Sequence, residues 1–156
     1  MWSLRMLGFA RAIATVGNLG RVPRAPGTIG SAIGWLLGLA LLRLPDSHWI
    51  VLGLITLIAV RAATLTEHAD HKHDPSYIII DEVVGMAAVL VAIPAVAASW
   101  WQGGLAFGLF RLFDVMKPPP LRWLAKFPRG WGIVLDDLGA TAYVIVMLTA
   151  ARTFLP

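Results

Sequence analysis

The chain has 156 residues, of which 58% are hydrophobic and only 14% are charged, and its mean hydropathy is +0.73. A soluble domain usually carries about 25% charged residues, so this composition argues against an ordinary soluble protein and favours a single membrane-embedded domain over residues 1–156. The absence of cysteine excludes disulfides and thiolate sites, and the net charge of +4 comes without a basic, aromatic-rich stripe, so no nucleic-acid partner is expected.

The first twenty residues mix charge and apolar side chains. Arg5 and Arg11 stand among Leu4, Leu7 and Phe9. This pattern is typical of an amphipathic helix at a membrane interface, and it fits equally well a plain helix that packs on the rest of the chain.

Five apolar stretches follow in chain order. Several are shorter than the roughly 20 residues that a helix needs to span a bilayer, and none shows the strict alternation of a membrane β-strand. The sequence therefore predicts an all-α integral membrane bundle of about four to five membrane-embedded helices plus the N-terminal amphipathic helix. The stretches cover residues 29–44, 49–65, 83–100, 104–116 and 138–155.

A back-and-forth path of these stretches separates the basic residues by side. Arg43 and Arg152 fall on one side and the other eleven basic residues on the opposite side, which the positive-inside rule predicts to be cytoplasmic. That set comprises Arg5, Arg11, Arg21, Arg24, Arg61, Lys72, Arg111, Lys117, Arg122, Lys126 and Arg129.

The acidic residues divide in the same way, although the positive-inside rule does not require it. Only Asp46 falls on the opposite side. Those on the predicted cytoplasmic side are Glu67, Asp70, Asp74, Asp81, Glu82, Asp114, Asp136 and Asp137.

Two acidic pairs begin apolar stretches, and a fifth acidic residue ends one. Asp81 and Glu82 precede the third stretch, and Asp136 and Asp137 precede the fifth, where carboxylates could simply cap helix N-termini. Asp114 lies at the C-terminal end of the fourth stretch, where the helix dipole disfavours an anion. Capping therefore cannot explain the whole set.

Acidic groups from three helices at one depth would repel one another, so we expect a positive counter-charge among them. A hard divalent cation such as Mg²⁺ takes oxygen ligands, and the cationic side chains of Arg111 and Lys117 suit a phosphate beside it. A structural pair between Arg111 and Asp114, three residues apart, is the simpler alternative. The combination predicts a phosphoryl-transfer site. The candidate metal ligands are Asp74, Asp81, Glu82, Asp114, Asp136 and Asp137.

Two polar segments add candidates. "RVPRAPGTIGS" (21–31) places Gly27 and Thr28 before the first stretch, where they could bind an anion or form an ordinary capped turn. "EHADHKHDP" (67–75) contains His73 and Asp74, which could bind metal or move a proton, or could lie in a solvated loop.

Four stretches across about 120 residues resemble, in order, the phosphatidylglycerophosphatase A family. The resemblance implies a helical fold and Mg²⁺-dependent hydrolysis of phosphatidylglycerophosphate, a phospholipid, at the cytoplasmic face of a bacterial inner membrane. One departure is "DDLGATAY", where the glycine of the family pattern is displaced or replaced. The matching stretches are "PRAPGTIGS" (23–31), "HDPSYIIIDEVVGM" (73–86), "FRLFDVMKPPPLRW" (110–123) and "GWGIVLDDLGA" (130–140).

The resemblance also implies roles for residues. Asp81, Asp114, Asp136 and His73 become the catalytic candidates, and Arg111, Lys117, Thr28 and Gly27 the substrate-binding candidates. A small transporter or channel with an acidic ion pathway is the alternative, although such residues normally lie near the midplane of the membrane and not at helix ends. The sequence does not define the oligomeric state.

Overall fold

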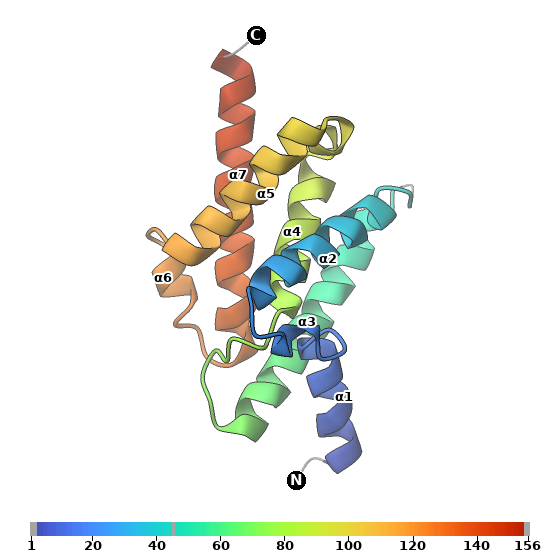
Figure 1. Ribbon diagram of the computed structural model, residues 1–156, viewed down its shortest axis with the longest axis vertical. Coiled ribbons are helices and arrows are strands. Elements are labelled where there is room, and N and C mark those ends of the chain that lie inside the picture. Colours follow the sequence, from blue (N-terminus) through green and yellow to red (C-terminus); the bar gives the residue numbers. More distant parts are fainter. Residues whose placement is uncertain (1–2, 45, 155–156) are drawn as a thin grey trace.

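A computed structural model describes residues 3–44 and 46–154, and helices are the only regular elements in these ranges (Figure 1). The prediction of an all-α fold is confirmed. The last residue of the fifth predicted stretch, Leu155, lies outside the described residues. In chain order the elements are α1 (Leu4–Ala14), η1 (Leu19–Arg21), α2 (Pro26–Leu41), α3 (His48–Asp70), α4 (Ile80–Ala92), η2 (Pro94–Ala98), α5 (Trp100–Met116), α6 (Leu121–Leu124) and α7 (Gly130–Phe154).

The helix α4 forms the centre of the bundle and packs against α2, α3 and α7. Its residues 83–91 are all buried, so this apolar run faces other helices and not the surroundings of the protein. The helix is 13 residues long and ends before Pro94, where a 3₁₀ segment takes over, because proline cannot continue the backbone hydrogen bonds. The third predicted stretch is therefore two elements, of which the first is core.

Glycine makes the close packing of α2 on α4 possible. A Cβ atom on Gly34 would lie 2.4 Å from the carbonyl oxygen of Val83, too close for any side chain. Gly30 and Gly38, one turn to either side, also face α4, which gives the small-residue spacing that lets two helix backbones approach.

Within residues 3–44 and 46–154, two helices, α3 and the Gly130–Arg152 part of α7, are long and apolar enough to cross a membrane by length and composition. The other helices are shorter, so the predicted number of four to five embedded helices is not established by helix length. The helix α3 also exposes a row of large apolar side chains: Trp49, Ile50, Leu54, Leu57 and Ile58.

The N-terminal segment forms a helix, as predicted, and α1 packs on α3. Its small residues Ala10 and Ala14 are buried, whereas Leu4 and Phe9 remain 88% and 69% exposed. The packing confirms the alternative of a helix that packs on the rest of the chain, and α1 also keeps apolar side chains on its outer surface.

The beginnings of α2, α4 and α7 and the end of α5 converge in the lower half of the bundle in Figure 1. The α2–α3 turn and the end of α7 lie toward the opposite end. This convergence brings together the acidic segments that the sequence separates by up to about 60 residues.

A candidate metal and phosphate site

Six carboxyl groups and two cations lie where these helices converge. Asp74 comes from the connection between α3 and α4, Asp81 and Glu82 from the first turn of α4, Arg111 and Asp114 from α5, Lys117 from the C-cap of α5, and Asp136 and Asp137 from α7. If every group were ionised, the cluster would carry a charge of minus four. Further cations or bound protons would offset this charge.

Three of the carboxylates form a compact set. One oxygen each from Asp81, Glu82 and Asp137 lies within 4.8 Å of the other two. Asp81 and Asp137 are only 8% and 2% exposed. Among the described residues, buried oxygens of Asp81, Glu82, Asp136 and Asp137 have no hydrogen-bond donor.

Unpartnered buried carboxylate oxygens are costly, because burial removes the water that would otherwise solvate them. The donor set consists of oxygen alone, with no thiol or imidazole, which is the ligand chemistry of hard divalent cations. The residues therefore fit a metal ion, held by Asp81, Glu82 and Asp137, with Asp136 and Asp114 next to them. Asp114 is close enough to Asp137 for their carboxyl groups to interact.

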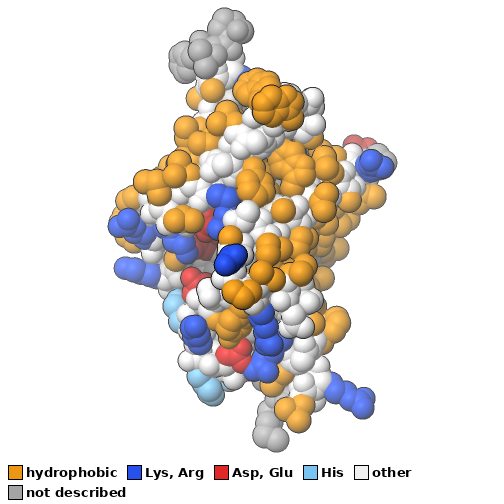
Figure 2. All heavy atoms as spheres, in the orientation of Figure 1, with side chains coloured by type: hydrophobic (Ala, Val, Ile, Leu, Met, Phe, Trp, Pro, Cys, Tyr) orange, Lys and Arg blue, Asp and Glu red, His pale blue; other side chains and the backbone are white. Residues whose placement is uncertain are grey.

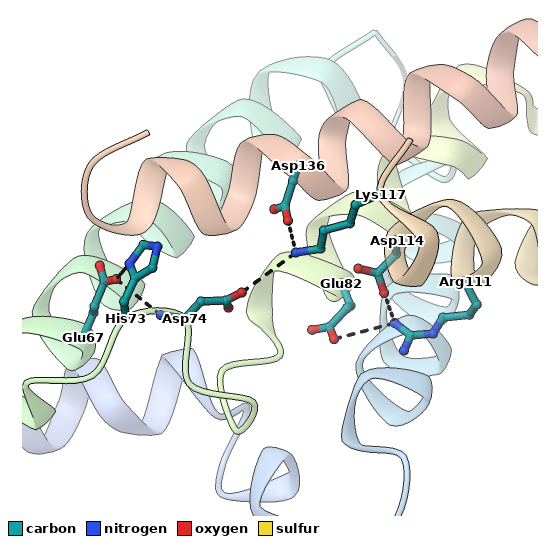
Figure 3. A network of polar contacts seen from close by, with 8 residues as sticks. All are labelled: Glu67, His73, Asp74, Glu82, Arg111, Asp114, Lys117 and Asp136. Atoms are coloured by element: carbon teal, nitrogen blue, oxygen red, sulfur yellow. Dashed lines mark hydrogen bonds and ion pairs between the residues drawn. The ribbon is translucent and has the colours of Figure 1, made fainter. Parts of the chain in front are cut away.

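Arg111 joins two of the carboxylates on one side of this set. Its Nη1 lies 2.5 Å from Asp114 Oδ2 and 3.6 Å from Glu82 Oε1, as Figure 3 shows. Asp114 thus makes the structural pair with Arg111 that its spacing indicates, and it also borders the metal candidates. The two predicted explanations for Asp114 are compatible.

Lys117 makes a corresponding bridge on the other side. Its ammonium group donates a hydrogen bond to Asp136 and lies 3.8 Å from Asp74 (Figure 3). Partial burial lowers the pKa of Lys117, but the hydrogen bond and the negative charge of Asp136 outweigh burial and raise that pKa above the usual lysine value. Lys117 is therefore a permanent cation at neutral pH.

On the α2 side, Gly27 lies directly against the ion pair of Arg111 and Glu82. A Cβ atom there would lie 2.3 Å from Glu82 Oε1 and 2.6 Å from Arg111 Nη2. The first turn of α2 can approach this pair only because residue 27 has no side chain. Gly27 therefore contributes to the site by leaving room for Glu82 and Arg111 next to α2.

Two predicted residues lie at the margin of the cluster. Thr28 is exposed in the first turn of α2. His73 is exposed and pairs with Glu67, and among the described residues no hydrogen bond or ion pair joins it to the clustered carboxylates. Asp70, which belongs to the acidic set on this side, instead accepts hydrogen bonds from Arg11 and Tyr77.

The structure adds two positioning residues that sequence reasoning missed. The hydroxyl of Thr141 on α7 donates to the carbonyl oxygen of Gly85 on α4 at 2.8 Å, one turn beyond Asp81 and Asp137. A Cβ atom on Gly85 would lie 2.7 Å from the Phe110 ring and 3.3 Å from Asp137 Cβ. The only signal in the sequence is a glycine inside an apolar run, one helical turn after an acidic pair.

Comparison with known proteins gives consistent matches. The chain is 37% identical over 136 residues to phosphatidylglycerophosphatase A of Haemophilus influenzae, covering 85% of this chain and 82% of that protein. It is 34% identical over 146 residues to a putative phosphatidylinositol-3-phosphatase of Bacteroides thetaiotaomicron, covering 90% and 91%.

A third relative is phosphatidylglycerophosphatase A of Escherichia coli, which is 30% identical over 144 residues, covering 89% of this chain and 76% of that protein. No solved structure matches the chain significantly. The family model described as phosphatidylglycerophosphatase A matches residues 12–152. The resemblance drawn from the four motifs is confirmed, and the chain belongs to the phosphatidylglycerophosphatase A family.

Proposed function

We propose that this chain is a Mg²⁺-dependent lipid phosphatase that hydrolyses phosphatidylglycerophosphate to phosphatidylglycerol and inorganic phosphate. Family membership supports the phosphatase activity and favours an enzyme over a transporter. The observation that carries the metal dependence is the set of buried, unpartnered carboxylate oxygens on Asp81, Glu82, Asp136 and Asp137.

The charge of the site supports the need for a metal. A phosphate monoester is itself an anion, and it cannot approach a cluster of net negative charge without strong repulsion. Bound Mg²⁺ would offset this charge, polarise the phosphoryl group and make water a better nucleophile at neutral pH. We assign its ligands to Asp81, Glu82 and Asp137, supported by Asp114, Asp136 and Asp74.

The protein's own cations have a separate role. Arg111 and Lys117 lie at the two flanks of the carboxylate set and would bind the phosphoryl oxygens, with Gly27 and Thr28 closing the site from α2. A carboxylate next to the phosphoryl group, Asp81, Asp114 or Asp136, would hold the transferred proton. His73 is the other candidate for this step, although its contact in the structure is Glu67.

We also propose that the protein is a multi-pass protein of the bacterial inner membrane, with the site at the cytoplasmic face. The apolar helices α3 and α7 and the exposed apolar face of α3 support a membrane location. All basic residues except Arg43 and Arg152 lie in the part of the bundle that holds the site, which supports the cytoplasmic orientation. A lipid phosphate at this depth could reach the carboxylates while its tails stay in the bilayer.

The test is phosphate release by the purified protein in detergent micelles, with Mg²⁺ and with a chelator. We expect release from phosphatidylglycerophosphate with Mg²⁺ and loss of release with the chelator. Phosphatidylinositol 3-phosphate is a necessary comparison substrate, because one relative carries a name of that specificity. Release that is unaffected by the chelator would overturn the metal assignment, and no release from either lipid would overturn the phosphatase.

A further inference from the structure

A cavity of about 310 Å³ lies between α2 and the beginning of α5, away from the carboxylates. Its walls are mainly aromatic and small residues. The principal lining residues are Trp35 on α2, Ala97 of η2, and Trp100, Gly103, Gly104 and Phe107 on α5. In Figure 2 hydrophobic side chains gather over the upper part of this face, and charged side chains lie mostly below them.

The cavity is aligned with the phosphate-binding cations on α5. Gly104, Phe107, Arg111 and Asp114 follow one another at intervals of three or four residues, so they share one face of the helix. Seven residues separate Gly104 from Arg111, which is a rise of about 10 Å. One face of α5 therefore passes from apolar to charged along its length.

The helix α2 repeats this arrangement in the opposite direction. The position of Gly27 lies against Arg111, and eight residues later Trp35 lies against Gly103. The two helices thus run antiparallel, in contact at the charged end and again at the cavity. A molecule lying along this seam meets cations first and then an apolar space.

We propose that the cavity receives an acyl chain of the phospholipid substrate while the head-group phosphate lies at Arg111 and Lys117. This inference rests on the proposed function and identifies where the lipid tail binds. An acyl chain fits because it is apolar, like most of the residues that line the cavity, and because it is covalently tied to the phosphate. Trp100 is 90% exposed and Gly104 is also exposed, so the cavity is accessible from the side of the bundle.

The absence of a side chain at Gly104 leaves space for the acyl chain in the cavity. A Cβ atom at this position meets no other atom within 4 Å, so a larger residue would extend into the cavity without disturbing the helix. Gly53 on α3 is a matched control, because it is also an exposed helical glycine with nothing within 4 Å and does not line the cavity. Gly→Leu should improve helix propensity equally at both sites.

The experiment compares Gly104→Ala, Gly104→Leu, Gly53→Leu and wild type on two substrates. One is dipalmitoyl phosphatidylglycerophosphate in mixed micelles, and the other is its deacylated head group, glycerophosphoglycerophosphate. A displaced acyl chain pulls the tethered phosphate out of position, so we expect Gly104→Leu to lower kcat/KM for the diacyl lipid about tenfold or more. Gly104→Ala should have a smaller effect.

The deacylated substrate shows whether each variant is folded and chemically competent. Its kcat/KM should stay within about twofold of wild type for every variant, and Gly53→Leu should leave both substrates unchanged. Unchanged hydrolysis of the diacyl lipid by Gly104→Leu, or an equal loss on both substrates, would overturn the acyl-chain site. Failure of wild type to hydrolyse either substrate would instead overturn the proposed function on which that site depends.

Discussion

Asp81 is the residue whose neutralisation tests the metal site most directly. Asp81→Asn keeps the shape of the side chain and removes one negative charge from the set that includes Glu82 and Asp137. We expect the Mg²⁺ concentration for half-maximal activity to rise at least about tenfold, because even indirect partners of metal ligands change affinity by 10–100-fold. A Mg²⁺ titration of phosphate release measures this change.

The control is Asp46→Asn, which removes an exposed acid at the opposite end of the bundle. It should leave the Mg²⁺ dependence unchanged. An unaltered Mg²⁺ titration for Asp81→Asn would show that this carboxylate is not a ligand.

Gly27 tests whether the close approach of α2 matters for the reaction. Gly27→Ala would place a methyl group against Glu82 and Arg111, which must then move apart by several tenths of an ångström or more. Because small displacements of positioning groups are costly in catalysis, we expect kcat/KM to fall about tenfold or more. Steady-state kinetics with phosphatidylglycerophosphate would measure it.

Gly8→Ala on α1 is the matched control for this change, because a Cβ atom there meets nothing within 4 Å. It should retain activity and stabilise the helix by about 0.5–1 kcal/mol. Equal activity of the two alanine variants would mean that the approach of α2 is not required.

At the scale of elements, Tyr77 joins the α3–α4 connection to α1 and α3. Its hydroxyl donates to Asp70 at 2.6 Å, and Asp70 also accepts from Arg11. Burial, then the hydrogen bond to Asp70 and its charge, raise the pKa of the Tyr77 hydroxyl above its usual value of 10.0. Since the folded pKa is the higher one, this stabilisation is complete below pH 10 and is lost as the pH rises through the raised pKa.

An alkaline titration of tyrosinate absorbance measures the pKa of Tyr77 in the Tyr143→Phe variant, because Tyr77 is then the only tyrosine in the chain. Its midpoint should lie above that of the same protein unfolded in denaturant. Asp70→Asn should move the midpoint down toward the unfolded value, because it removes the charge that opposes ionisation. A midpoint equal to that of unfolded protein would contradict the contact.

The predicted helix boundaries agree with the structure where proline marks a helix end. Pro26 begins α2, and α5 ends at Met116, just before Lys117 and three prolines, so both boundaries lie within a few residues of the prediction. The start of α7 was wrong by eight residues: the helix begins at Gly130, not at 138. The stretch 130–137 reads as a break because it contains two acids and two glycines, but packing of α7 on α4 overrides that local pattern.

This shift changes how Asp136 and Asp137 are understood. They lie in the second turn of α7, not at its start, so N-terminal capping does not explain them. Hydropathy also could not distinguish a buried core helix from one that faces lipid, so the sequence did not show that residues 83–91 form the centre of the bundle. The acidic cluster itself was predictable, because all its members precede or follow apolar stretches on one side.

At the scale of the whole molecule, polarity is uneven along the bundle. The site, the long connections and all basic residues except Arg43 and Arg152 lie in the lower half of the bundle or close to its middle in Figure 1, and the short α2–α3 turn lies toward the other end. This separation supports the proposed orientation in a membrane, because cytoplasmic loops keep an excess of lysine and arginine.

The absence of native cysteine allows the proposed orientation to be tested with single introduced thiols. Ser76 is exposed in the connection before α4, near the site, and Asp46 is exposed in the turn after α2, at the opposite end. In spheroplasts, a membrane-impermeant maleimide should label Asp46→Cys and leave Ser76→Cys unlabelled until the membrane is permeabilised. Inverted membrane vesicles should show the reverse pattern. Labelling of Ser76→Cys in intact spheroplasts would place the site outside the cytoplasm, and labelling of both would contradict a bundle that spans the membrane between these two positions.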